Sequence, residues 1–305
     1  MPPREWHEVP VFLHGITSER QPTSHAGTYL AFLSLVNASL REAGKEPFTE
    51  APIMVEWGWE ASLGQDKCLA EAERLVAAEV LPPTAPRRGI SLNPLRRFAS
   101  GAREAFLFGV ADLFYYVSAD GSRAVRDNVF RHLATEIDLK RGGRGSRFGV
   151  SLTFVGHSAG TIIAHDFLYR LFGWGARPAF GLTFNKVRRL QQRGRLRVRR
   201  FYTLGSPIAP FIFRSEALIG KIVNREKLNP EVIGLGREYG LPNPRWVNFW
   251  TPSDLISYPV AFLYDTVEGE AVVVDERVDL GESFPGVHSA YWRSEAIAAA
   301  VAETF

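Results

Sequence analysis

The chain has 305 residues, of which 46% are hydrophobic, 12% aromatic and 23% charged. This length suits one large α/β domain with insertions, and the composition excludes a disordered, fibrous or collagen-like chain. The formal net charge is only +3, so the overall charge does not define a class of partner.

Cysteine usage and hydropathy set further limits on the class of protein. The single cysteine, Cys68, excludes an intramolecular disulfide framework and a cysteine-rich zinc site, which fits a reducing, cytoplasmic compartment. The longest apolar stretch, 105–119, is interrupted by Asp112 and is shorter than the roughly 18 apolar residues of a membrane span. We therefore expect no transmembrane segment, and no motif predicts a metal or a cofactor.

Short apolar strands alternate with amphipathic helices along most of the chain. Such alternation predicts a mainly parallel sheet of about six strands flanked by helices. In chain order we expect strands at 9–14, 52–59, 150–155, 197–207, 245–250 and 270–280, and helices at 28–44, 122–140, 161–172 and 289–305.

Three segments interrupt this alternation within what we predict to be a single domain, 1–305. Residues 60–120 predict a helical insertion, and 173–195 and 206–244 are candidate cap segments. Aromatic side chains in these segments could line an acyl pocket that prefers medium chains over acetate, or they could belong to the structural core. They are Phe106, Phe108, Phe114, Phe180, Phe211 and Phe213.

The most informative motif follows the strand at 150–155. The chain continues into GHSAG, which begins at Gly156 and has Ser158 at its centre, and a helix follows at once. A G-x-S-x-G motif between a strand and a helix is typical of a nucleophile elbow, in which the serine hydroxyl stands above the carboxyl edge of the sheet. Gly156 and Gly160 would relieve crowding on both sides of this sharp turn. In the alternative interpretation, Ser158 only caps the helix.

This motif resembles the nucleophile elbow of the α/β-hydrolase superfamily, in its serine esterase and lipase branch. The resemblance implies the α/β-hydrolase fold with helical cap or lid insertions. It also implies a catalytic triad in the chain order serine, acid, histidine. The first predicted strand already reaches the sheet by residue 9, so we expect the two strands that normally precede it to be missing and the sheet to have about six strands.

Only two histidines follow Ser158 in the chain. His165 lies one to two turns into the helix after the elbow, whereas His288 leaves room for further strands and precedes the last predicted helix. The superfamily has its catalytic histidine in such a loop, so we predict His288 as the general base, against a histidine that merely precedes a helix. The seven histidines are His7, His14, His25, His132, His157, His165 and His288.

Three carboxylates are candidates for the acid of the triad. Asp254 follows the predicted strand at 245–250 directly, as the acid does in the superfamily, and is our prediction. Asp265 and Asp275 are its rivals, and Asp275 lies inside a strand pattern. The alternative role of Asp254 is an Asx turn, which the neighbouring Pro252 would also suit.

The resemblance also implies two backbone donors for the oxyanion. One is the N–H of Ala159, directly after the nucleophile. The other is the N–H of Ile16, in the loop after the first strand, where Gly15 lets the chain approach the substrate closely. We predict His14 to be a packing residue at the strand end.

These features together predict a serine hydrolase that cleaves a carboxylic ester of a small molecule. The same triad could serve a thioesterase, a lactonase, an amidase or an acyltransferase, and a non-catalytic scaffold that binds a partner is the alternative from another class. Basic runs at 141–147 and 188–200 could attract an anionic membrane or a nucleic acid, but we expect no nucleic acid and interpret both as solvated connections.

Overall fold

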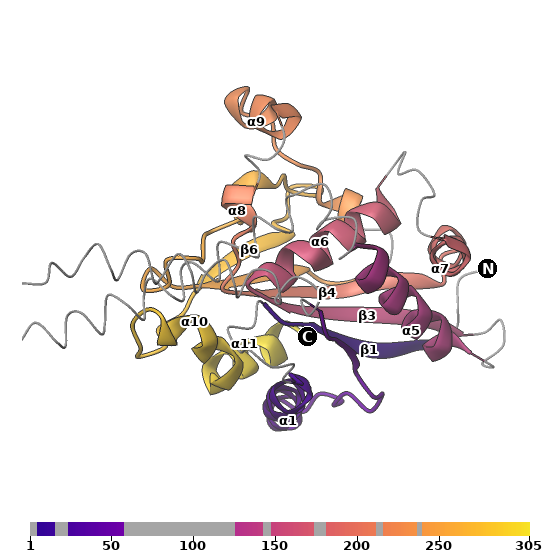
Figure 1. Cartoon of the computed structure of the whole chain (residues 1–305), viewed down its shortest axis with the longest axis horizontal. Helices are drawn as coiled ribbons and strands as arrows, with labels where there is room; N and C mark the ends of the chain where they lie inside the picture. Colours follow the sequence, from indigo (N-terminus) through magenta and orange to yellow (C-terminus); the bar gives the residue numbers. More distant parts are fainter. Residues whose placement is uncertain are drawn as a thin grey trace, which may run out of the picture.

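Six parallel strands form the centre of the molecule (Figure 1). In the computed structural model, which describes residues 5–15, 24–57, 126–142, 148–173, 181–211, 216–236 and 240–305, the strand order is β2-β1-β3-β4-β5-β6, and all neighbours pair in parallel. The predicted α/β architecture with a parallel sheet is therefore confirmed. The strands are β1 Glu5–Leu13, β2 Ile53–Val55, β3 Phe148–His157, β4 Leu196–Leu204, β5 Trp246–Trp250 and β6 Val273–Arg277.

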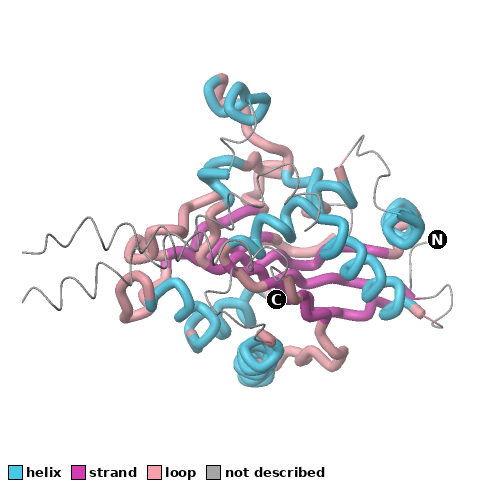
Figure 2. Tube along the Cα trace, in the orientation of Figure 1, coloured by secondary structure: helices cyan, strands magenta, loops and turns pink. Residues whose placement is uncertain are grey.

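Helices cover both faces of this sheet (Figure 2). On one face, α5 (Arg131–Arg141), α6 (Ala159–Phe172) and α7 (Gly181–Gln192) pack over what we call the first core. On the other face, α1 (Ala26–Glu42) and α11 (Glu295–Thr304) pack together over the second core. Both faces of the sheet therefore carry buried apolar side chains, as in other parallel sheets that helices cover on both sides.

A β-bulge interrupts β4. Leu152 of β3 pairs with Val198, but the next residue of β3 pairs with Arg200, so Arg199 is the extra residue. The bulge lets Val198 and Phe201 face the same core although they are three positions apart. It also places the side chains of Arg199 and Arg200 against the end of α11.

Several elements differ from the sequence-based expectations at their ends. β2, β4 and β6 end earlier than the strands predicted at 52–59, 197–207 and 270–280. β1 begins at Glu5 instead of residue 9, because its polar first half pairs with β3 although it is only partly buried. The helix predicted at 122–140 begins with a π-helical turn, Arg126–Phe130, before α5. The last predicted helix is divided into α10 (Gly286–Ala290), a 3-10 turn and α11. The division occurs because Ser294 caps α11, its hydroxyl accepting the N–H of Ile297 at 3.3 Å.

The candidate cap segments are described only in part, and the whole insertion predicted at 60–120 lies outside the described residues. Within 173–195, α7 packs against α5 and forms part of the layer over the sheet. Within 206–244, α8 (Ile208–Phe211) contributes Phe211 to the first core. α9 (Glu216–Val223) stands away from the body of the molecule in Figure 1.

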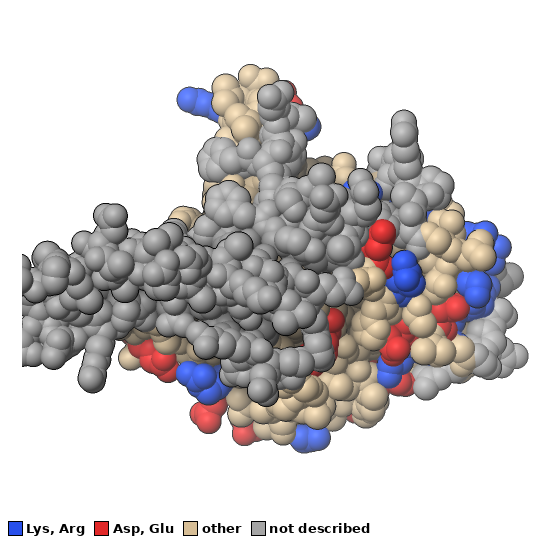
Figure 3. Space-filling model, viewed as in Figure 1, with Lys and Arg blue, Asp and Glu red and all other residues tan. Residues whose placement is uncertain are grey.

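Among the described residues that are visible in Figure 3, basic and acidic side chains are interspersed. Among the helices that the structure describes, none has the length and hydropathy to cross a bilayer.

Candidate active site

Ser158 lies at the junction between β3 and α6, at the carboxyl edge of the sheet. Its backbone has φ 51° and ψ −129°, a combination that is costly for a residue with a side chain and is found at functional turns. Its backbone N–H donates to the carbonyl of Leu204 in β4 at 3.0 Å. The Ser158 side chain makes no capping hydrogen bond to α6, so helix capping does not account for this serine.

Close backbone contacts surround the elbow, and they explain its glycines. A Cβ atom at Gly156 would lie 3.0 Å from the Cα of Thr161, and one at Gly160 would lie 2.4 Å from the carbonyl oxygen of His14. Both contacts are with backbone, which cannot move aside as a flexible side chain can. The strained turn at Ser158 therefore needs both glycines.

Asp254 and His288 meet beside this elbow. The Nδ1–H of His288 donates to Oδ2 of Asp254 at 2.8 Å, while Oδ1 of the same carboxylate accepts the N–H of Ile256 at 3.0 Å. The second bond is an Asx turn, so Asp254 shapes its own loop and orients the imidazole at once. Burial raises the pKa of Asp254, but the hydrogen bond and positive charge of His288, with the Ile256 N–H, bring this pKa below its ordinary value. The carboxylate is therefore ionised at neutral pH.

Gly205 connects the elbow to this pair. It follows Leu204, which accepts the Ser158 N–H, and its φ is +57°. A Cβ atom here would lie 3.1 Å from Oδ2 of Asp254 and 3.3 Å from Cε1 of His288. The absence of a side chain at Gly205 thus leaves the space in which the carboxylate and the imidazole meet.

The two rival carboxylates have other partners. Asp275, in β6, accepts hydrogen bonds from the backbone N–H groups of Val260 and Ala261 at 2.8 and 2.9 Å and from the amide of Asn248 at 2.8 Å. It therefore holds the loop after Asp254 against the sheet. Asp265 is exposed and accepts the backbone N–H of Thr266 at 2.8 Å. Neither carboxylate bonds to His288 in this structure.

The predicted oxyanion donors are described in part. Ala159 is the first residue of α6, where backbone N–H groups have no acceptor within the helix and the helix dipole favours negative charge. Gly15 lies directly against Ser158, since a Cβ atom there would be 3.1 Å from Oγ of Ser158. Ile16, the predicted second donor, lies outside the described residues.

His14 is buried and packs at the end of β1, as its sequence context predicts. Its ring stacks between those of His25 and Trp57, with centroid distances of 3.9 and 5.6 Å. Its Nε2 accepts the backbone N–H of Trp57 at 3.2 Å. Burial, with the neighbouring charge of His25, lowers the pKa of His14 to about 3, so this ring is neutral, and its Nε2 lone pair is already bonded to the Trp57 N–H.

Sequence reasoning missed two side chains that contact the pair. His157 lies in the elbow itself, and its Nε2–H donates to the backbone carbonyl of His288 at 2.5 Å. Tyr291 is fully buried, and burial followed by the charge of Asp254 raises its pKa, so the phenol stays protonated beside the carboxylate. The position of His157 inside the G-x-S-x-G motif could have indicated a role near Ser158. Nothing in the sequence distinguishes Tyr291 from the apolar residues of the last predicted helix.

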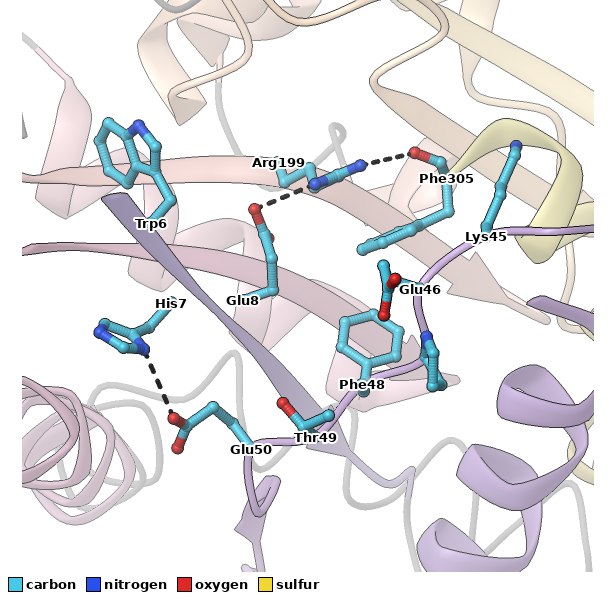
Figure 4. Close-up of a pocket in the computed structure, with 11 residues that line it drawn as sticks. Trp6, His7, Glu8, Lys45, Glu46, Phe48, Thr49, Glu50, Arg199 and Phe305 are labelled. Carbon is cyan, nitrogen blue, oxygen red and sulfur yellow. Dashed lines mark hydrogen bonds and ion pairs between the residues drawn. The ribbon is translucent and has the colours of Figure 1, made fainter. Parts of the chain in front are cut away.

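A separate pocket lies at the opposite, amino-terminal end of the strands (Figure 4). It has a volume of about 620 Å³ and is lined by β1, the segment after α1, Arg199 and Phe305. The carboxylate of Glu8 accepts a hydrogen bond from Arg199 at 3.0 Å, and Arg199 also donates to the Phe305 carbonyl at 2.8 Å. These polar groups thus bond to neighbouring groups of the protein, and none of Ser158, Asp254 and His288 lines the pocket.

Comparison of the chain with protein-family models, with curated proteins and with solved structures found no match in any of the three. Within the described ranges, no three or more His, Cys, Asp or Glu side chains are grouped so that they could hold a metal ion.

Proposed function

We propose that this protein is a serine hydrolase of the α/β-hydrolase type that cleaves carboxylic esters of small molecules. The observation that carries the proposal is the 2.8 Å bond from His288 to the buried carboxylate of Asp254, beside a serine on a strained strand-to-helix turn. The order of the three residues, after β3, β5 and β6 respectively, supports the superfamily assignment.

The reaction uses Ser158 as the nucleophile. Its Oγ attacks the acyl carbon while His288 takes the hydroxyl proton, and the tetrahedral intermediate then expels the alcohol, which leaves with that proton. Water attacks the acyl-enzyme in the same way and releases the acid. Asp254 holds the imidazole with its proton on Nδ1 and stabilises the positive charge that forms on the ring.

The oxyanion of each intermediate is held by backbone N–H groups in this proposal. Ala159 supplies one from the start of α6, and Ile16 supplies the other from the loop beside Gly15. The preference for medium acyl chains stays a prediction, because Phe211 is the one phenylalanine of that set among the described residues and it belongs to the first core.

Other activities are possible on the same triad. Thioester, lactone or amide hydrolysis and acyl transfer would use the same three residues in the same roles. Nucleic-acid binding is disfavoured, because Arg197 and Arg200 of the basic run at 188–200 are buried within the fold. The lone Cys68 supports a cytoplasmic location, and peripheral contact with an anionic membrane stays a prediction.

A fluorophosphonate probe tests the proposal, because it reacts covalently with an activated serine. We expect stoichiometric labelling of the wild-type chain that maps to Ser158 by peptide analysis. Ser158→Ala should abolish labelling and lower kcat for p-nitrophenyl esters by on the order of 10⁴ to 10⁶.

Ser206→Ala is the matched control for this experiment. Ser206 is a buried hydroxyl whose Oγ lies 2.8 Å from Oγ1 of Thr161, close to the elbow but outside the proposed chemistry. This variant should be labelled at Ser158 like the wild type. A folded wild-type chain that resists the probe, or a Ser158→Ala variant that keeps full esterase activity, would show that the protein is a scaffold or acts by other residues.

A further inference from the structure

The residue before the nucleophile is bonded to the residue that we propose as the base. His157 is 7% exposed, and its Nε2–H donates to the backbone carbonyl of His288 at 2.5 Å. The two imidazole rings lie beside each other with centroids 4.7 Å apart. The side chain of the elbow thus contacts the main chain of the loop that presents the base.

This bond satisfies a carbonyl that the local fold leaves without a helical partner. His288 lies in α10, which has only five residues. The last carbonyls of a helix receive no hydrogen bond from a backbone N–H of the same helix. The Asp254 bond fixes the ring at Nδ1 but leaves the backbone of α10 without a polar anchor to the sheet. The bond from His157 provides that anchor.

We propose that His157 is a positioning residue that fixes the main chain of His288 relative to Ser158. The inference rests on the proposed hydrolase function. Since His157 and Ser158 are adjacent in the chain, the anchor and the nucleophile move together, and the distance between nucleophile and base no longer depends on the flexibility of the loop before α10. A misplacement of about 1 Å in such a pair lowers rates by on the order of 100-fold.

The charge state of His157 suits this role. Burial, followed by the positive charge of His288, lowers the pKa of His157 to about 3. The ring is therefore a neutral donor at neutral pH. It can hold the carbonyl without placing a second positive charge beside the imidazolium that forms on His288 during acyl transfer.

Packing is the competing explanation, because the His157 ring also lies near the rings of Tyr291 and Trp292, at 6.1 and 5.7 Å. Any aromatic ring would satisfy packing, whereas only a side chain with a donor at the Nε2 position would satisfy the carbonyl. Phenylalanine and glutamine separate the two roles, since phenylalanine keeps the ring and glutamine keeps the donor.

The experiment compares His157→Phe and His157→Gln with the wild type. It measures the rate of fluorophosphonate labelling at Ser158, kcat and KM for an ester, and the melting temperature. We expect His157→Phe to lower labelling rate and kcat by about 10- to 100-fold with KM changed less than about twofold, and His157→Gln to stay within about threefold of the wild type. The acid limb of the kcat/KM profile should report one proton in all three proteins, because His157 does not titrate in that range.

His165→Phe is the matched control. It removes a partly buried histidine from α6 whose Nε2 is 2.7 Å from the Tyr264 hydroxyl, and it should leave the labelling rate unchanged. If the Phe variant does not fold, His157→Asn, whose amide is one methylene too short to reach the carbonyl, takes its place.

Two results overturn the inference: a donor-less variant as reactive as the wild type, or a Gln variant as slow as the donor-less one at equal melting temperature. Failure of the wild-type chain to be labelled would instead overturn the proposed function itself. The two failures are therefore distinguishable.

Discussion

The two ends of the sheet both bury charged side chains, and they use them differently. At the amino-terminal end, Arg200 and Arg245 are each 1% exposed and donate to backbone carbonyls. At the carboxyl end, Asp254 is 2% exposed and shares its oxygens between one backbone N–H and the imidazole of His288. Burial is similar, but the partners are not.

The two buried arginines both donate hydrogen bonds to the carbonyl of the bulge residue in β4. Because Arg199 is the extra residue of the β4 bulge, its carbonyl accepts hydrogen bonds from Arg245 at 2.9 Å and from Arg200 at 3.0 Å. The guanidinium groups do not lose their protons in proteins, so these two buried side chains have one charge state. At the carboxyl end, imidazoles can gain or lose a proton. The difference teaches that the same degree of burial can serve two arrangements, one in which a charge binds only fixed backbone carbonyls and one in which it binds another side chain.

The largest effect should come from the carboxyl end. If Asp254 orients His288, Asp254→Asn should lower kcat by on the order of 10³ to 10⁴, since an amide favours the wrong imidazole tautomer. The loss is measured as kcat per active site, with the sites counted by active-site titration. The melting temperature of the variant checks that it folds.

Asp275→Asn is the matched control, because Asp275 holds a loop without contacting His288. It should lower the melting temperature and leave kcat per active site within about threefold. Equal losses of kcat in the two variants would contradict the assignment of Asp254 as the acid and of Asp275 as a residue that only holds the loop.

The second effect should come from the amino-terminal end. Arg245→Met leaves several buried carbonyls without a donor, so the free energy of unfolding should fall by about 3 kcal/mol, with kcat per folded molecule unchanged. Urea denaturation measures the first quantity. Lys186→Met, which removes an exposed ion pair with Asp138 at 3.7 Å, should change it by less than about 0.5 kcal/mol. Similar stabilities of the two variants would contradict a structural role for the buried arginine.

The third effect should be a pH dependence that belongs to the carboxyl end. His14 and His157 have pKa values lowered from 6.5 to about 3, so between these values the unfolded chain binds more protons than the folded one. Stability must therefore fall as the pH falls from about 6.5 towards 3, by up to about 1.4 kcal/mol per pH unit for each histidine. The lowered pKa of Asp254 adds a loss in the same direction below about pH 4.

Urea titrations between pH 7 and pH 4 measure this slope. His157→Gln should reduce it by up to about 1.4 kcal/mol per pH unit, whereas Arg245→Met should leave it unchanged. A slope that persists in full after the histidine is replaced would assign the pH dependence to other groups.

The sequence predicted best where a local pattern determines the structure. Alternating apolar runs identified the six strands, and GHSAG between a strand and a helix identified the turn at Ser158. Asp254 and His288 followed from chain order and from loops directly after strands, which parallel sheets bring to one edge. The structure places these two side chains in contact, as the predicted triad requires, while their catalytic roles remain for experiment.

Contacts between distant segments were beyond prediction. The basic run at 188–200 was interpreted as solvated, yet Arg197 and Arg200 are buried. A sequence shows the charge, but it does not show which carbonyls a bulge leaves unpaired. For the same reason the bond from His157 to the His288 carbonyl could not be expected, because its acceptor is a backbone atom and has no signature in the sequence.

The pairing of α1 with α11 has a consequence for biosynthesis. The apolar face of α1 leaves the ribosome early, but α11, which packs against it over the second core, is translated more than 250 residues later. The part of the first core that comes from β1 to β4 and α5 to α7 can assemble in the meantime, while the part of the α1 face that packs against α11 stays uncovered. A nascent chain with such an uncovered face is prone to aggregation, so this protein should depend on chaperones during translation more than its final stability would suggest.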